Sequence, residues 1–324
     1  MFRSFALVFL FSLLSSPLFA QYTASKGMNA PKTESVEETY REKGTNKLKK
    51  RTLTKSVVHD SYGNAAGNQH DLAVDGAFDG QTIAVLHLYV DSSFDFSLPK
   101  KALAEKGFSV YRWIGNAPSE EELEEKLKKA CQLWIISDGT RKLSDGHVKI
   151  IKKFFNSGKG VYIWGDNEPF YADANVVAKA LIGSGMDGNL PGNKVVDADF
   201  KHKKKGLRVG HDITTGLEFM YEGITIATLR PTKGLEPILY GSAGNLVTAV
   251  YEKKGKRMIL DGGFTRLYNS WDEAGTARYV KNAASWLVNY ERFGDKVVGE
   301  DIRKENEAKM KKKKKDAISN RVNK

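Results

Sequence analysis

The stretch IAVLHLYV at residues 83–90 is short and almost wholly apolar. A strand that is covered on both faces has this composition, because helices pack on both sides of a parallel sheet. Similar runs recur at residues 108–113, 133–136 and 161–164, and stretches with helical spacing separate them. Strands that alternate with helices predict an α/β fold with a mostly parallel, doubly wound, flavodoxin-like sheet.

The second half of the chain follows a different pattern. After an irregular glycine- and lysine-rich insertion at residues 183–210, four apolar runs follow closely, at residues 224–229, 237–240, 246–251 and 257–260. The sequence KKGK at residues 253–256 predicts a hairpin between the last two. We therefore expect antiparallel strands to be added late to the sheet, before an amphipathic helix over residues 276–290.

Three other segments flank this domain, which we place at residues 81–292. Residues 1–20 combine a basic start, an apolar run and a small residue at Ala20, which predicts a cleaved signal peptide and a secreted or periplasmic protein. An uncleaved membrane anchor is the alternative; no later run is long enough to span a membrane. Residues 21–80 are polar and predict a largely disordered lead-in, of which residues 72–78 can pack on the domain. Residues 293–324 form a basic tail.

Several local patterns are shared with a known superfamily. They are CQLWIISDG at residues 131–139, GKGVYIWG at residues 158–165, GHDITTGL at residues 210–217 and RMILDGG at residues 257–263. In this order and spacing they resemble the class I glutamine amidotransferase-like superfamily, and most of all its ThuA-like and other non-amidotransferase members. The resemblance covers roughly residues 81–292 and implies the same α/β fold.

The resemblance fails at the catalytic position. Active amidotransferases carry a cysteine on the sharp turn after the strand that corresponds to residues 161–164, whereas this turn reads GDNEP at residues 165–169. The single cysteine, Cys131, precedes the third strand at the opposite end of the sheet, and we interpret it as a buried small hydrophobic residue. Glutaminase chemistry is therefore not expected.

Ligands of parallel sheets bind beyond the carboxyl ends of the strands. The polar residues predicted at this edge are Asp91, Ser92, Ser93, Ser137, Asp138, Thr140, Asp166, Asn167, Glu168, Asp261, Thr265 and Arg266. The aromatic residues among them are Phe170, Tyr171, Phe264, Tyr268 and Trp271.

Three interpretations of this edge stay open. In the first, a non-catalytic site binds a saccharide or another small polar ligand, because carboxylates and amides bond to hydroxyl groups while flat rings cover apolar sugar faces. Its ligand-binding residues would be Asp91, Ser137, Asp138, Asp166, Asn167, Glu168, Arg266 and Trp271. In the second, a hydrolase acts on a carbohydrate-related substrate, with Asp138, Asp166 and Glu168 as its acid and base. Alternatively, these three residues and Asp91 would be the ligands of a hard cation. In the third, the domain is a protein-interaction scaffold and the carboxylates are turn and cap residues.

The remaining patterns predict no cofactor, and we assign no residue as a metal ligand. No histidine pair has the spacing of a zinc site. We interpret His87 as a buried strand residue and His211 as a turn residue. The run Lys311–Lys315 predicts either a solubilising tail or electrostatic contact with a polyanion. Aromatic residues do not interleave with it, which argues against dedicated nucleic-acid recognition.

Overall fold

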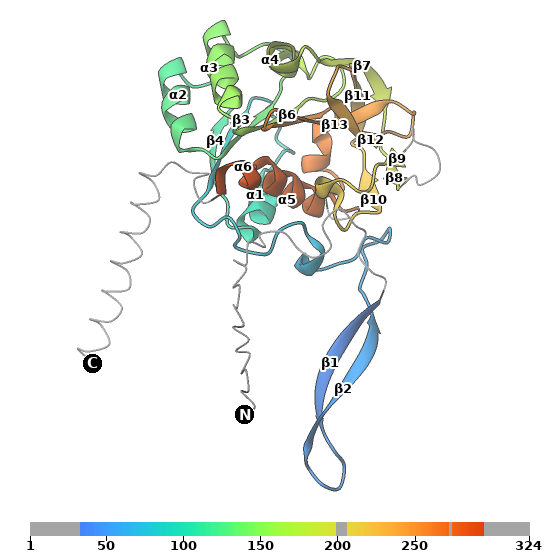
Figure 1. The fold of residues 1–324 in the computed structure, drawn as a ribbon. Coiled ribbons are helices and arrows are strands. Elements are labelled where there is room, and N and C mark those ends of the chain that lie inside the picture. Colours follow the sequence, from blue (N-terminus) through green and yellow to red (C-terminus); the bar gives the residue numbers. More distant parts are fainter. Residues whose placement is uncertain (1–32, 199–205, 272–273, 295–324) are drawn as a thin grey trace, which may run out of the picture.

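The computed structural model of the chain describes residues 33–198, 206–271 and 274–294 (Figure 1). The predicted signal peptide, the lysine-rich part of the insertion and the tail with Lys311–Lys315 lie outside these residues. Among the described residues, no helix is long and apolar enough to cross a membrane.

The central feature is an eight-stranded sheet with the strand order β4-β3-β5-β6-β14-β13-β12-β9. Five strands are parallel: β3 (Thr82–His87), β4 (Ser109–Ile114), β5 (Gln132–Ile136), β6 (Gly160–Trp164) and β14 (Lys256–Asp261). Three antiparallel strands extend it: β13 (Leu246–Lys253), β12 (Leu235–Tyr240) and β9 (Gly206–Leu207). The five parallel strands have the flavodoxin-like order. The predicted fold class and the hairpin between β13 and β14 are confirmed.

Helices cover both faces of this sheet (Figure 1). The helices α1 (Ser97–Glu105) and α5 (Thr276–Leu287) pack on one face, and α2 (Glu120–Lys129), α3 (Asp145–Asn156) and α4 (Ala172–Ile182) pack on the other. A last short helix is α6 (Tyr290–Phe293). Every residue of β5 and β6 is buried as a result, which is why their sequences are continuous apolar runs.

The helix starts follow from local sequence. The Ser119 hydroxyl accepts a hydrogen bond from the Glu122 backbone N–H and so caps α2. At α3 the Ser144 hydroxyl accepts one from the His147 backbone, and His147 Nδ1 accepts one from the Ser144 backbone N–H at 3.1 Å. These caps satisfy N–H groups that a helix leaves unpaired in its first turn.

The insertion at residues 183–210 is more regular than its sequence predicts. It contains β7 (Met186–Pro191) and β8 (Val195–Asp197) as well as β9. The first pairs with β11 (Thr225–Leu229), and the second with β10 (Phe219–Tyr221). These strands are short and only partly buried, so they lack a continuous apolar run that would reveal them.

The expectation of a largely disordered lead-in is wrong for residues 33–80. Strands β1 (Thr33–Arg41) and β2 (Leu48–Ser56) form an antiparallel hairpin that projects from the domain (Figure 1). Its strands are rich in charged residues, which are uncommon in strands. The sequence therefore does not predict these two strands. Oppositely charged residues face each other across it, such as Glu38 and Arg51.

Residues 57–80 pack on the domain through a buried cluster of charges. The fully buried Asp71 carboxylate lies 2.9 Å from Lys106 Nζ, 2.9 Å from Arg278 Nε and 2.8 Å from Lys281 Nζ. The backbone N–H of Leu72, the next residue, donates to Asn282 Oδ1 at 2.7 Å. Leu72 and Phe78 are buried as predicted. This segment is thereby joined to the end of α1 and to α5.

Candidate functional site

The neighbouring strands β3 and β5 mark the switch point of the sheet. The chain leaves β3 toward β4 on one side, whereas β5 lies on its other side, so the connections after the two strands diverge. Folds of this type bind ligands beyond the carboxyl ends of the strands at this point. Tyr89 and Asp91 follow β3, and Ser137 and Asp138 follow β5.

Tyr89 lies at the centre of the residues gathered there. Its partly buried ring is 5.3 Å from the Phe170 ring, edge-on, and 4.9 Å from the Phe264 ring, measured between centroids. Its hydroxyl lies close enough to Tyr268 and Asp91 for the three side chains to shift each other's pKa values. Burial raises the pKa of Tyr89, and the charges of Asp91, Asp166 and Asp138 raise it further. Three of the predicted carboxylates are therefore close enough to act on one phenol.

Asp138 stands on the open side of this group. Its side chain retains 21% of its accessible surface and forms an ion pair of 2.7 Å with Lys142 Nζ. The same ammonium donates to the Leu88 backbone carbonyl at 2.8 Å, so Lys142 joins the ends of both switch-point strands. Asp138 and Lys142 thus present one charge of each sign to solvent beside Tyr89.

Asp173 belongs to the same region and was missed by sequence reasoning. It lies in the first turn of α4 and is fully buried. Its Oδ1 accepts from the backbone N–H groups of Lys142 at 3.0 Å and Leu143 at 2.8 Å, whereas Oδ2 has no hydrogen-bond partner among the described residues. Burial raises its pKa, and the charge of Asp138 adds to the rise. An acidic residue in a first helical turn after a strand was the available signal, but it is a common one.

Ser137 is a structural residue of this edge. It is fully buried, and its hydroxyl accepts from the backbone N–H groups of Asp173 at 3.0 Å and Ala174 at 3.1 Å. The hydroxyl therefore caps α4 and is not presented to a ligand.

Asp166 is the second residue of the turn that follows β6. It is fully buried; Oδ1 accepts from the Asn167 backbone N–H at 2.8 Å and Oδ2 from the Thr265 backbone N–H at 3.1 Å. Burial raises the pKa of Asp166 to about 7, although these two hydrogen bonds lower it. Both oxygens are occupied, so Asp166 joins β6 to the short 3-10 helix Phe264–Leu267.

Arg266 and Asp261 form a buried ion pair behind Asp166. The two side chains are completely buried, with Arg266 Nη2 3.1 Å from Asp261 Oδ1. Arg266 also donates to the backbone carbonyls of Glu222 at 2.9 Å and Gly263 at 3.1 Å, and Asp261 Oδ2 accepts from Thr248 Oγ1 at 3.0 Å. The structure thus holds Arg266 in the core and not at a ligand-accessible position. Trp271, with 7% of its surface exposed, is likewise part of the core.

The other predicted residues lie on the exposed turns. Asp91 is exposed and accepts from the Ser93 backbone N–H at 2.8 Å. Asn167 is partly exposed, and its Oδ1 accepts from Thr225 Oγ1 at 2.6 Å. Glu168 is exposed and precedes the cis peptide bond to Pro169. Within the described ranges, no three His, Cys, Asp or Glu side chains are grouped to hold a metal ion. The carboxylates expected to converge on a cation are therefore not assembled for it.

The predictions for three isolated residues are confirmed. Cys131 is buried, and burial raises its pKa to about 12, so its thiol is unreactive. His87 is buried in β3, its Nδ1 lies 3.0 Å from Arg112 Nη1, and burial lowers its pKa to about 4. His211 precedes a short 3-10 helix, and its Nδ1 accepts from the Ile213 backbone N–H at 3.2 Å.

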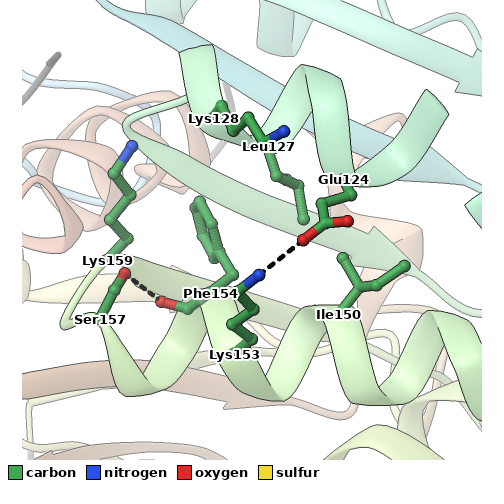
Figure 2. Close-up of a pocket in the computed structure, with 8 residues that line it drawn as sticks. All are labelled: Glu124, Leu127, Lys128, Ile150, Lys153, Phe154, Ser157 and Lys159. Carbon is green, nitrogen blue, oxygen red and sulfur yellow. Dashed lines mark hydrogen bonds and ion pairs between the residues drawn. The ribbon is translucent and has the colours of Figure 1, made fainter. Parts of the chain in front are cut away.

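A cavity of about 200 Å³ lies away from the carboxyl edge, between α2 and α3 (Figure 2). Its lining residues are Glu124, Leu127, Lys128, Ile150, Lys153, Phe154, Ser157 and Lys159. They belong to α2, to α3 and to the link that enters β6, so the cavity extends toward the amino end of that strand.

Comparison with known proteins gives no family assignment. No protein-family model and no curated protein matches the chain. A ThuA-like protein from Parabacteroides merdae is 12% identical; the match covers 64% of this chain and 89% of that one, with a TM-score of 0.43. An exo-β-1,4-mannosidase from Opitutaceae bacterium strain TAV5 is 11% identical, with coverages of 67% and 34% and a TM-score of 0.34. A carbohydrate deacetylase is 12% identical, with coverages of 62% and 32% and a TM-score of 0.35. At these TM-scores the similarities support no inference about activity, and the amidotransferase-like resemblance stays a prediction.

Proposed function

We propose that this chain is an exported, non-catalytic binding protein that holds a saccharide or a similar polyhydroxylated ligand at the switch point between β3 and β5. The observation that carries the proposal is the composition of this point: partly exposed aromatic rings lie beside carboxylates that solvent can reach. Aromatic rings cover apolar sugar faces, and carboxylates accept hydrogen bonds from hydroxyl groups. Export rests on residues 1–20 alone.

The residues assigned to the ligand follow from exposure. Tyr89, Phe170 and Tyr268 would provide the rings, and Asp91 and Asp138 would accept from hydroxyl groups. Lys142, paired with Asp138, would donate to a ring or hydroxyl oxygen. Asp166, Ser137 and Arg266, which the sequence placed among the ligand contacts, would support these residues from behind.

The geometry of Asp166 favours binding over catalysis. A general acid or base has to come within hydrogen-bond reach of the proton that it transfers. Asp166 has a suitable pKa of about 7, but it is fully buried and both of its oxygens accept backbone hydrogen bonds. Its protonation state therefore concerns the fold and not a substrate.

A hydrolase that acts on a carbohydrate-related substrate is the second candidate, and Asp173 is the observation that favours it. Its pKa is raised, Oδ2 has no partner among the described residues, and the charge of Asp138 acts on it. Glycoside hydrolysis uses a pair of carboxyl groups, and Asp138 would be the member of the pair that solvent reaches. Release of reducing sugar that disappears in Asp173→Asn and Asp138→Asn would establish this candidate, and binding without release would reject it.

The proposal is tested with residues 21–324 in a thermal-shift panel of oligosaccharides and sugar acids. A ligand of the folded state raises the melting temperature in a dose-dependent way. Titration calorimetry of a positive compound should show binding weakened at least about tenfold in Asp138→Asn and in Tyr89→Ala, equivalent to about 1.4 kcal/mol. Glu236→Gln, an exposed residue of β12, is the matched control and should bind normally. A panel without any positive compound, or equal binding by all variants, would overturn the proposal.

A further inference from the structure

The cavity between α2 and α3 has an apolar floor. Leu127 and Phe154 are almost fully buried, Ile150 is partly buried, and all three side chains point into the gap between the helices (Figure 2). Its volume of about 200 Å³ is below the roughly 300–1,000 Å³ that is typical of pockets for drug-sized ligands. The space therefore suits a small ligand with an apolar body.

The rim of the cavity carries an excess of positive charge. Lys128, Lys153 and Lys159 line it against the single carboxylate of Glu124. Glu124 is paired with Lys153 at 2.7 Å, and these side chains keep 41% and 78% of their surface. Exposed pairs of this kind contribute little to stability, so the pair can open at low cost. With three ammonium groups and one carboxylate, the rim keeps a net positive charge that an anion could neutralise.

Lys159 is the most constrained of these cations. It is partly buried, its Nζ donates to the Ala130 carbonyl at 2.5 Å and lies 5.5 Å from the centroid of the Phe154 ring. An ammonium has three N–H donors, and the Ala130 carbonyl is the hydrogen-bond acceptor that the described residues give it. Burial lowers the pKa of Lys159. A negative charge at this point would supply an acceptor and offset the cost of burying the cation.

We propose that this cavity binds a small amphipathic carboxylate, with its apolar body on Leu127, Ile150 and Phe154 and its carboxylate on Lys159. Lys128 would lie close enough to add charge attraction at the rim. The site is separate from the switch point of the sheet, and it would take a ligand of a different chemical class from a saccharide. Each site can therefore be filled or lost without the other.

Benzoate is the probe, and its neutral isostere benzamide is the control ligand. In a calorimetric titration of residues 21–324, benzoate should bind saturably and at least about tenfold more tightly than benzamide, because the neutral amide cannot form an ion pair with the Lys159 ammonium. Lys159→Gln should weaken benzoate binding by a similar factor. Lys152→Gln, an exposed neighbour on α3 that does not line the cavity, should leave it unchanged.

A second variant keeps the test decisive if Lys159→Gln alters the fold. Ile150→Trp fills the apolar part of the cavity and retains every lysine, so it should abolish benzoate binding while the melting temperature and circular dichroism stay close to those of the parent protein. The proposal is overturned if benzoate does not bind, if benzamide binds equally well, or if benzoate still binds to folded Ile150→Trp.

Discussion

The two halves of the carboxyl edge contain the same residue types, but one half buries their side chains and the other leaves them accessible to solvent. In the inner half, after β6 and β14, Asp166, Asp261 and Arg266 are completely buried, and each has its hydrogen-bonding groups taken by the protein. In the outer half, after β3 and β5, Asp91 and Asp138 keep access to solvent beside partly exposed rings. A carboxylate at a strand end is thus a possible ligand contact only where its oxygens are still accessible.

The inner half should respond to mutation as a part of the core. Arg266→Met leaves the Asp261 carboxylate buried without its cation, and loss of one partner of a buried pair costs about 3–5 kcal/mol. Urea denaturation should show a fall of this size in the free energy of unfolding. Arg230→Met is the matched control, because its partner Asp187 keeps 60% of its side-chain surface and an exposed pair is worth up to about 1 kcal/mol. Equal losses in both variants would contradict the division of the edge.

Asp166 should link stability to pH with a definite sign. Its pKa rises from an ordinary value of 3.8 to about 7 in the folded protein. The folded state therefore holds the proton more tightly than the unfolded state, so the stability that it contributes is complete below about pH 4 and is lost as the pH rises to about 7. A span of about three pKa units corresponds to at most about 4 kcal/mol.

The measurement is the free energy of unfolding of the parent protein and of Asp166→Asn between pH 4 and pH 8. The free energy of unfolding of the parent protein minus that of the variant should fall as the pH rises, because only the parent protein loses stability through Asp166. Buried His87 acts in the opposite direction with its pKa of about 4, and it is common to both proteins, so it cancels in the difference. A difference that does not change with pH would show that Asp166 is ionised throughout.

The outer half should respond through binding and not through folding. Asp138→Asn removes a charge from a partly exposed ion pair, so the free energy of unfolding should change by less than about 1 kcal/mol. The affinity for the saccharide found in the panel should fall at least about tenfold. A large loss of stability with unaltered affinity would show that Asp138 stabilises the fold and does not contact the ligand.

Glu168 should show the smallest effect of the predicted residues. It is exposed on the turn after β6. Glu168→Gln should leave the free energy of unfolding within about 0.5 kcal/mol, as is usual for surface substitutions. The dissociation constant for the same saccharide should change by less than about twofold. A clear loss of affinity would extend the binding site to the turn after β6.

Local sequence was sufficient for the parallel strands of the sheet but not for the division of its edge. The apolar run at residues 161–164 and the Ser119 cap depend on neighbouring residues, and both were predictable. Whether Asp166 is accessible depends on the Thr265 backbone, 99 residues later in the chain. Arginine is mostly exposed in proteins, so nothing local to Arg266 reveals that Asp261 and the Glu222 carbonyl hold it in the core.

The same limit explains the error in residues 33–80. Asp71 lies in a polar stretch, yet it is buried because Lys106, Arg278 and Lys281 converge on it from distant parts of the chain. The β1–β2 hairpin had one usable signal, a connection with Gly44 and Asn46 between two segments of opposite charge. Both residues adopt the positive φ angles that such turns require. The cavity between α2 and α3 had no signal, since it arises from the spacing of two helices.

The most direct test of ligand binding at the switch point is to map the ligand on the molecule. Isotope-labelled protein comprising residues 21–324 would be titrated with the saccharide from the panel, and the backbone amide shifts would be followed by NMR. The largest shifts are expected at Tyr89, Asp91, Asp138 and Lys142, with Asp166 and Arg266 little changed. Shifts centred on the α2–α3 cavity or on the β1–β2 hairpin, with none at the switch point, would contradict it.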